Sequence, residues 1–147
     1  MSGTSGHKGL NISVLGAGYW GPNLIRVFDQ LPGARVHAIC DRDQGRLEAM
    51  RADYKGASLS IDADEVIDND ETDAVVIALP ASQHYEYARR ALGAGKHCFV
   101  EKPLALKSAE CRELIELADQ RGVTLMVGHT FEYNAAVQRI KSEIEQG

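Results

Sequence analysis

A glycine-rich run near the start of the sequence has the residue types and spacing of a phosphate-binding loop. The run is Gly16-Ala17-Gly18-Tyr19-Trp20-Gly21, which follows a β-rich stretch over residues 10–15 and precedes apolar residues at helical spacing. In that context the first glycine permits a tight turn, the second lets the backbone approach a pyrophosphate, and the third lets a helix pack closely on a strand. The N-terminus of that helix offers N–H groups and partial positive charge to phosphates. Glycines also serve plain turns, so the prediction depends on the strand–helix context.

A carboxylate follows the next predicted strand, about 20 residues beyond the glycine run. Asp41 can accept hydrogen bonds from both hydroxyls of an adenosine ribose, and it would repel a 2′-phosphate, which favours NAD over NADP. The neighbouring Arg42 carries a guanidinium that can hold such a phosphate. The alternative for Asp41 is a turn residue that caps the following helix. The pair predicts a nicotinamide dinucleotide site, with NAD as the expected cofactor and NADP as the alternative.

A lysine stands at the end of a later predicted strand, in the run Glu101-Lys102-Pro103. Ligands of open α/β sheets bind outside the carboxyl ends of the strands, so Lys102 is directed to the region where a nicotinamide would lie. A lysine in that position can take part in proton transfer. The alternative is an exposed lysine followed by a proline that stops the strand, and the residues alone leave both interpretations open.

Short apolar runs alternate with amphipathic stretches along the chain. We expect strands over residues 10–15, 34–40, 58–61, 73–79, 97–100 and 123–127. We expect helices after Gly21 up to Pro32-Gly33, over about 43–51, around 62–68, over 83–94 with Ser82 as N-cap, from Ser108 as N-cap to Gly122, and over 135–145. The run 73–79 is essentially apolar, as strands buried on both faces tend to be. This alternation predicts a parallel sheet covered by helices on both faces.

Composition places the chain among ordinary globular proteins. Of its 147 residues, 44% are hydrophobic and 25% charged, which excludes a disordered tail, a collagen-like fibre and a disulfide mini-protein. The net charge of −5 argues against a broad attraction to nucleic acid or an anionic membrane, and no apolar run approaches the roughly 20 residues that cross a bilayer. Three separated cysteines and scattered histidines indicate neither a disulfide framework nor a metal site. We expect one acidic cytoplasmic domain over residues 10–147, preceded by a flexible leader over residues 1–9 without the apolar core of a signal peptide.

Longer blocks of the sequence resemble a known family. They are the glycine run, Asp41, LPASQHYEYARRALGAGKHCFVEKPLAL over residues 79–106 and MVGHTFEYNAAVQRIK over residues 126–141. Together they resemble the glucose–fructose oxidoreductase, inositol dehydrogenase and rhizopine-catabolism (Gfo/Idh/MocA) family of nicotinamide-dependent oxidoreductases. The segments GYWGPNLIR and GHTFEYN are further similar to those of the family branch that acts on UDP-linked N-acetyl sugars and their uronates. The resemblance implies a Rossmann-like, doubly wound α/β fold of three layers, with about six parallel strands in the order 3-2-1-4-5-6.

The resemblance also implies roles for individual residues. Lys102 matches the family's catalytic lysine, which contacts the hydroxyl that is oxidised and helps to move its proton, and the bond to Pro103 is often cis in the family. Pro80 and His84 match a loop that closes over the cofactor, and Glu101 matches a residue beside the nicotinamide ribose. The residues expected to contact the cofactor are Gly16, Gly18, Tyr19, Trp20, Gly21, Asp41, Arg42, Leu79, Pro80, His84, Glu101 and Lys102. From spacing alone, His84 would instead be an exposed residue at a helix start.

The end of the matched region corresponds to a crossover into a second domain of the family. His129, Tyr133 and Asn134 fall in this crossover, where family members begin to contact substrate, and the alternative for them is packing between domains. His37 and His97 lie in predicted strands and are expected to be structural. The second α/β domain supplies most of the substrate pocket, further catalytic residues and usually the oligomer interface in the family, and we expect it to be absent from these 147 residues.

The expected function is the NAD-binding half of an oxidoreductase that transfers a hydride between a sugar or sugar-nucleotide hydroxyl and NAD. A homo-oligomer is compatible with the resemblance. One alternative is a non-catalytic NAD-sensing or partner-binding module, which would expose Val137, Ile140 and Ile144 of the last helix. Another is a methyltransferase, which also uses a glycine loop and an acid after the second strand, although the EKP and GHTFEYN blocks argue against it.

Overall fold

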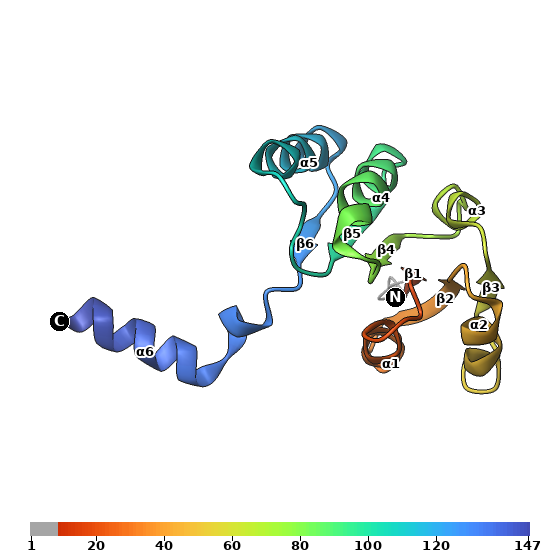
Figure 1. Cartoon of the computed structure of the whole chain (residues 1–147), viewed down its shortest axis with the longest axis horizontal. Coiled ribbons are helices and arrows are strands. Elements are labelled where there is room, and N and C mark those ends of the chain that lie inside the picture. The colour runs from red at the N-terminus through yellow and green to blue at the C-terminus, as the bar shows by residue number, and fades with distance from the viewer. Residues whose placement is uncertain (1–8) are drawn as a thin grey trace, which may run out of the picture.

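The computed structural model describes residues 9–147, and within that range the chain forms a six-stranded parallel sheet (Figure 1). Its strands are β1 (Leu10–Leu15), β2 (Ala34–Cys40), β3 (Ser58–Ser60), β4 (Ala74–Ile77), β5 (His97–Val100) and β6 (Leu125–Val127). They lie in the order β3-β2-β1-β4-β5-β6, and every neighbouring pair is parallel. The predicted strand order is confirmed. The leader expected over residues 1–9 lies outside the described residues except for Gly9.

Helices cover both faces of the sheet, as the alternating pattern predicts. They are α1 (Gly21–Asp29), α2 (Gln44–Arg51), α3 (Ala63–Ile67), α4 (Ala81–Gly93), α5 (Ser108–Arg121) and α6 (Ala135–Gln146). α1 and α2 pack on one face, whereas α3, α4 and α5 pack on the other (Figure 1). α6 follows the 3₁₀-helix η1 (Thr130–Tyr133), extends away from the sheet and has no buried residue. Within residues 9–147, no helix is long and apolar enough to span a membrane.

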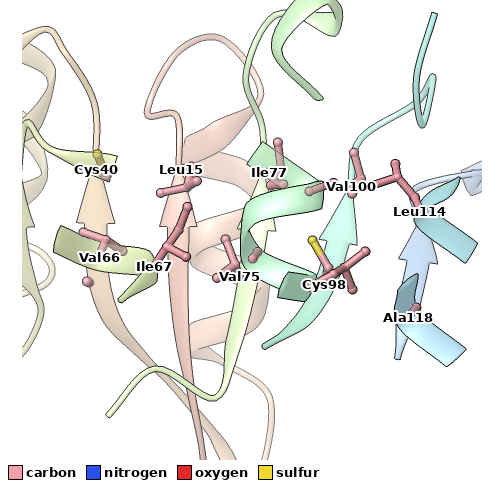
Figure 2. Close-up of a cluster of buried hydrophobic side chains, with 14 residues drawn as sticks. Leu15, Cys40, Val66, Ile67, Val75, Ile77, Cys98, Val100, Leu114 and Ala118 are labelled. Atoms are coloured by element: carbon pink, nitrogen blue, oxygen red, sulfur yellow. The ribbon is translucent and has the colours of Figure 1, made fainter. Parts of the chain in front are cut away.

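β4 lies at the centre of the core, where Val75, Val76 and Ile77 are fully buried. Val75 and Ile77 pack with Leu15 against α3, α4 and α5 (Figure 2), whereas Val76 packs on the side of α1 and α2. Successive side chains of a strand point to opposite faces, so a strand with helices on both sides must be apolar throughout. β4 is nevertheless shorter than the predicted 73–79, because the residues after Ile77 leave the sheet to line a cleft.

Two predicted helix caps are wrong. α4 begins at Ala81 and α5 at Ser108, so neither Ser82 nor Ser108 is an N-cap. An N-cap residue has non-helical backbone angles, and the residues with extended backbone at these positions are Pro80 (ψ 142°) and Lys107 (ψ 139°). Both serines already lie within the helical first turn. The helices themselves were predicted correctly, with starts placed one or two residues too late.

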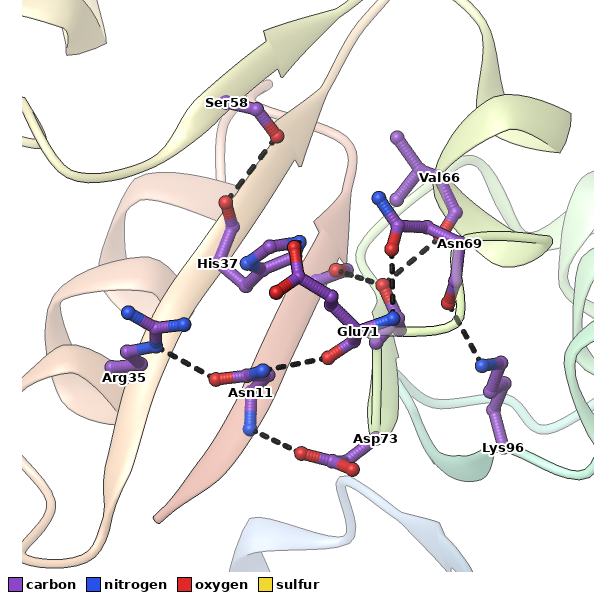
Figure 3. Close-up of polar contacts among 11 residues, drawn as sticks. Asn11, Arg35, His37, Ser58, Val66, Asn69, Glu71, Asp73 and Lys96 are labelled. Carbon is purple, nitrogen blue, oxygen red and sulfur yellow. Dashed lines mark hydrogen bonds and ion pairs between the residues drawn. The ribbon is translucent and has the colours of Figure 1, made fainter. Parts of the chain in front are cut away.

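Polar side chains hold the amino-terminal ends of several strands together (Figure 3). The Asn11 side-chain amide donates to the Glu71 carbonyl at 2.7 Å, and its oxygen accepts from Arg35 Nε at 2.7 Å. The Asn11 backbone N–H donates to the Asp73 carboxylate at 2.8 Å. His37 lies beside this network in β2, with its Nε2 4.0 Å from the Glu71 carboxylate. The network ties the amino-terminal ends of the strands together. The carboxyl-terminal ends of the strands, on the opposite side of the sheet, are therefore left open for a binding site.

Two cysteine thiols are buried in the core. Burial raises the pKa of the Cys98 thiol from the ordinary value of 9.0 to about 12. Burial, together with the negative charge of the adjacent Asp41, raises the pKa of the Cys40 thiol to about 11. Both thiols therefore keep their protons in the folded chain at pH values where an unfolded chain has released them.

We expect the free energy of unfolding to fall as the pH rises above about 9, because the unfolded chain then binds fewer protons than the folded chain. Each proton that only the folded state retains contributes a slope of up to about 1.4 kcal/mol per pH unit. Urea unfolding at a series of pH values between about 8 and 11 measures this slope. Cys98→Ala should show a shallower decline than the wild type. Identical slopes for the two proteins would contradict the assignment to the buried thiols.

Candidate functional site

A cleft of about 860 Å³ opens at the carboxyl ends of β1, β2 and β4. The loops that follow these strands contribute Gly16, Gly18, Asp41 and Leu79 to its walls. The strand order reverses between β1 and β4, and ligands of open α/β sheets bind at such a switch point. The fold therefore brings the glycine run and the carboxylate, which are far apart in sequence, into one cavity.

The glycine run forms a tight loop between β1 and α1 in which side chains cannot be accommodated at two positions. Gly16 has a positive φ of 102°, and a Cβ there would lie 2.5 Å from the Ala78 carbonyl oxygen. A Cβ on Gly21 would lie 2.0 Å from the Gly16 carbonyl oxygen. α1 begins directly at Gly21, and no side chain caps its N-terminus. The loop residues Gly18, Tyr19 and Trp20 line the cleft just before the positive end of the α1 dipole, which favours an anion there, whereas Gly21 itself lines neither this cleft nor the smaller cavity described below.

Asp41 connects the glycine loop to the start of α2. Its side chain is only 10% exposed. One carboxylate oxygen accepts the Ala17 N–H and the other accepts the Asp43 N–H, both at 2.8 Å. The residue that caps α2 is Asp43, whose side chain accepts the N–H groups of Gly45 and Arg46. The alternative of Asp41 as the helix cap is therefore wrong, and its carboxylate instead lies at the wall of the cleft.

A second cavity of about 410 Å³ adjoins the cleft, since Tyr19, Trp20, Ala78 and Leu79 line both. Its further lining residues are Ala81, His84, Glu101, Lys102, Gly128 and Thr130. Lys102 is exposed, and the peptide bond between Lys102 and Pro103 is cis. The Glu101 carboxylate accepts the Lys102 N–H at 3.3 Å. The two cavities form a continuous binding region that runs from Asp41 at one end to Lys102 at the other.

A family model described as an oxidoreductase family with an NAD-binding Rossmann fold matches residues 10–129. The chain belongs to the Gfo/Idh/MocA oxidoreductase family. The matched residues are the NAD-binding Rossmann domain of this family, which confirms the family and the fold that the sequence blocks predict. The methyltransferase alternative is thereby excluded.

Relatives of the chain are longer proteins, among them several oxidoreductases. Inositol 2-dehydrogenase 2 from Saccharopolyspora erythraea is 36% identical over 141 residues, which are 94% of this chain and 41% of the relative. An uncharacterised oxidoreductase from Streptococcus pneumoniae is 36% identical over 134 residues, covering 91% of this chain and 36% of that protein. The crystal structure of a 3-ketoreductase from Actinomadura kijaniata in complex with NADP and TDP-benzene matches with a TM-score of 0.86 and 26% identity, over 95% of this chain and 43% of the ketoreductase. The chain thus spans about two fifths of the length of these relatives.

His84 is a buried positioning residue in this Gfo/Idh/MocA domain. It is only 2% exposed, so the expectation of an exposed residue at a helix start is wrong. Its Nε2 lies 2.7 Å from the Leu79 carbonyl oxygen and its Nδ1 lies 2.6 Å from the Pro103 carbonyl oxygen. A ring N–H can donate to such an oxygen, so the imidazole bridges the loop after β4 and the loop after β5. Both loops line the cavity that contains Lys102.

We expect His84→Ala to lower the free energy of unfolding by at least about 2 kcal/mol, because it leaves a cavity in place of a buried ring and removes the ring N–H that donates to a loop carbonyl oxygen. Chemical denaturation measures this loss. The control is His129→Ala, which removes the same side chain from an exposed position and should change stability by less than about 0.5 kcal/mol. Equal stability of the two variants would show that His84 does not hold the loops.

Other residues predicted for the site are distributed as follows. Arg42 is exposed and lines the larger cleft, and Pro80 lines the same cleft. His129, Tyr133 and Asn134 line neither cavity among the described residues, and the Asn134 side chain caps α6 by accepting two backbone N–H groups. The structure therefore does not bring these three residues to the site formed by residues 9–147.

The alternative of a non-catalytic module expects the apolar residues of the last helix to be exposed, and Val137, Ile140 and Ile144 are exposed. His97, one of the two strand histidines, accepts the Thr124 N–H at 3.0 Å between neighbouring strands, which fits a structural role.

Sequence reasoning missed several lining residues, among them Gly128 and Arg46. Gly128 follows β6, and a Cβ there would lie 3.0 Å from the Glu101 carboxylate, so the glycine makes room for that side chain. It begins the GHTFEYN block, which is the signal that could have identified it. Arg46 lies in the first turn of α2 and lines the larger cleft. It carries no motif signal, because only the fold of the chain brings it to Asp41.

Proposed function

We propose that this chain binds NAD along the carboxyl ends of the strands, with the adenosine ribose at Asp41, the pyrophosphate over the glycine loop and the nicotinamide towards Lys102. We further propose that a longer protein containing it transfers a hydride between the cofactor and a hydroxyl-bearing carbon of a sugar or sugar nucleotide. The proposal rests on the position of the glycine loop between two side chains. Asp41 lines the larger cleft on one side of the loop, and Lys102 lines the adjoining smaller cavity on the other.

The residues present fit a dinucleotide. Side chains are excluded at Gly16 and Gly21, where a Cβ would collide with backbone oxygen atoms. At Gly18 a Cβ would meet only the Arg46 side chain at 3.3 Å, so glycine is not required there for folding. Because Gly18 has no side chain, its backbone is open to the cleft. A pyrophosphate needs this space to approach the loop and the N-terminus of α1 closely.

The Asp41 carboxylate supports the placement of the ribose. Each of its oxygens accepts one backbone hydrogen bond, and a carboxylate oxygen has a further lone pair for a ribose hydroxyl. The two backbone bonds hold the carboxylate in place before a ligand arrives, so binding does not have to order it. A fixed negative charge at this point also disfavours a 2′-phosphate, which supports NAD as the preferred cofactor.

Lys102 supports the assignment of the reacting end. Bound NAD supplies a nicotinamide ring that accepts or releases a hydride. The Lys102 side chain can hydrogen-bond a substrate hydroxyl in the smaller cavity. As the neutral amine it would take the hydroxyl proton, and as the resulting ammonium it would return that proton in the reverse reaction. The His84 imidazole contacts the carbonyl oxygen of Pro103, the residue after Lys102, and so supports the loop that carries the lysine.

The substrate class rests on relatives. Two relatives are named for polyhydroxylated substrates: inositol 2-dehydrogenase 2 of Saccharopolyspora erythraea and a D-apiose dehydrogenase of Paraburkholderia graminis. The ketoreductase of Actinomadura kijaniata was crystallised with TDP-benzene. These names support a sugar or sugar nucleotide as the substrate. The segments GYWGPNLIR and GHTFEYN support the family branch that acts on UDP-linked N-acetyl sugars and their uronates.

A thermal-shift titration of the chain with NAD, NADH, NADP and NADPH tests the proposal. A one-site ligand at 100 times its dissociation constant stabilises the folded state by about 2.7 kcal/mol, which a melting curve resolves. We expect stabilisation by NAD and NADH that exceeds that by NADP and NADPH. Trp20 is the only tryptophan of the chain and lines both cavities, so quenching of its fluorescence by NADH gives an independent readout. No stabilisation and no quenching by any of the four would contradict the proposal.

A further inference from the structure

We infer that His84 is a pH-sensitive clamp. With both ring nitrogens protonated, it holds the loop after β4 and the loop after β5 together, and the loss of one proton releases one of the two loops. The inference goes beyond dinucleotide binding, because it concerns how the chain itself arranges these loops. Its effect on the affinity for NADH rests on the proposed function.

The two hydrogen-bond partners of the His84 imidazole are both acceptors. Nδ1 lies 2.6 Å from the Pro103 carbonyl oxygen, and Nε2 lies 2.7 Å from the Leu79 carbonyl oxygen. A carbonyl oxygen only accepts, and a neutral imidazole has one N–H and one bare nitrogen, whereas the imidazolium has two N–H groups. Only the imidazolium can therefore donate to both oxygens. In the neutral ring the bare nitrogen would face an oxygen, and the repulsion between their lone pairs opens one of the contacts.

His97 shows the opposite arrangement and provides an internal reference. Its Nδ1 accepts the Thr124 N–H at 3.0 Å, so this nitrogen carries no proton while the hydrogen bond exists. The partners of the two rings thus require different numbers of protons. The difference between His84 and His97 follows from the fold, because each partner is a backbone group of another segment.

Opposing effects act on the second proton of His84. The residue is only 2% exposed and lies in the first turn of α4, near the positive end of the helix dipole. Burial and the dipole both disfavour a cation at this position. The two carbonyl oxygens favour it, because they accept hydrogen bonds that only the charged ring can donate to both.

The ionisable groups on the elements around His84 do not determine its charge by themselves. Glu101 and Lys102 line the same cavity and carry opposite charges. The others are a phenol of the glycine loop and two pairs whose members bind each other: Tyr19, Tyr85 with Glu113, and Arg90 with Asp64. The second proton is therefore held chiefly by the two carbonyl contacts, which couples its loss to the opening of one of them.

Release of one loop changes the wall of the binding region. Leu79 lines both cavities, and Lys102 directly precedes Pro103, whose carbonyl oxygen His84 contacts. A dinucleotide that binds after the release must order the loop again, which costs part of its binding free energy. We therefore expect the affinity for NADH to fall by about two- to tenfold as His84 loses its second proton, which corresponds to one hydrogen bond.

NMR of the wild-type chain, with ¹⁵N and ¹³C labels, tests the clamp over pH values from about 5 to 8. We expect the His84 ring to have two protonated nitrogens at the acidic end of this range and one at the alkaline end. The carbonyl ¹³C shift of either Leu79 or Pro103 should move to that of a free carbonyl with the same midpoint. Exposed His129 is the control, and its titration should leave both carbonyl shifts unchanged. A His84 ring that keeps one number of protons throughout, or two carbonyl shifts that do not follow it, would overturn the inference.

The affinity for NADH over the same pH range, measured by quenching of Trp20 fluorescence, tests the effect on the site. The wild type should lose affinity towards the alkaline end, and His84→Gln, which cannot titrate there, should show no such loss. His129→Gln removes an exposed histidine and should keep the pH dependence of the wild type. An equal pH dependence in His84→Gln and the wild type would overturn the coupling of His84 to the site. If the chain binds no NADH at any pH, or if His84→Gln does not fold, the NMR result on the wild type still decides the clamp, and only the former outcome refutes the proposed function.

Discussion

Gly21→Ala is expected to abolish dinucleotide binding and to lower the free energy of unfolding by at least about 2 kcal/mol. The added methyl group would lie 2.0 Å from the carbonyl oxygen and 2.9 Å from the carbonyl carbon of Gly16. Both atoms belong to the backbone, so no side-chain rotation can relieve the contact. α1 must then move away from the end of β1, and its N-terminus no longer meets the glycine loop. Urea unfolding measures the loss of stability, and titration with NADH measures the loss of binding.

Two further glycine variants make this expectation specific. Gly93→Ala is the control, because a Cβ at this helical position has no neighbour within 4 Å, and it should raise stability by up to about 1 kcal/mol without affecting binding. Gly18→Ala separates folding from binding, since its Cβ would meet only the movable Arg46 side chain. We expect it to keep near wild-type stability and to lose at least about tenfold in dinucleotide affinity through obstruction of the pyrophosphate. Wild-type affinity in both Gly18→Ala and Gly21→Ala would refute the glycine loop as the phosphate site.

Lys102→Ala is expected to reduce turnover by about 10²- to 10⁴-fold while leaving the affinity for NAD nearly unchanged. The reason is that Lys102 lies in the smaller cavity, where it can act on a substrate hydroxyl, whereas the glycine loop and Asp41 lie along the larger cleft. Binding is measured on this chain. Turnover is measured in a full-length oxidoreductase that carries the chain as its cofactor domain, because the relatives are more than twice as long as this chain.

A lysine close by in the sequence provides the control for Lys102. Lys107 is exposed, pairs with Glu110 in the first turn of α5 and lines neither cavity among the described residues. Lys107→Ala should therefore leave both turnover and NAD affinity at wild-type values. Retention of turnover by Lys102→Ala would remove this residue from the mechanism, and an equal loss in both variants would indicate a general effect of charge.

Local pattern was sufficient to predict most of the sheet. β1, β2 and β5 begin and end at the predicted residues, because each is a short run of strand-forming residues bounded by a turn or a change of polarity. The ends of β4 and β6 were not predictable from hydrophobicity alone. Leu79 and Val123 are apolar and partly buried, so they extend the pattern, but they lie outside the ladder of paired strands.

The site was predictable where a residue acts through its own neighbours in sequence, and much less so where it acts through distant ones. The glycine loop could be predicted because a strand and a helix flank it directly. The burial of His84 could not, since it depends on the Pro103 carbonyl, which reaches the imidazole only once the loops after β4 and β5 pack together. The same holds for Arg46, whose approach to Asp41 and Gly18 requires α2 to fold back beside the glycine loop.

The measurement that tests the central claim most directly is a backbone N–H chemical-shift map of the chain titrated with NAD. The account predicts that the largest changes occur at Gly18, near Asp41 and near Lys102, because the dinucleotide spans the two adjoining cavities at the carboxyl ends of the strands. The amides of the outer helices α5 and α6 should change little. Saturable shifts confined to α5, α6 or the amino-terminal edge of the sheet, with Gly18 and Lys102 unaffected, would contradict the account.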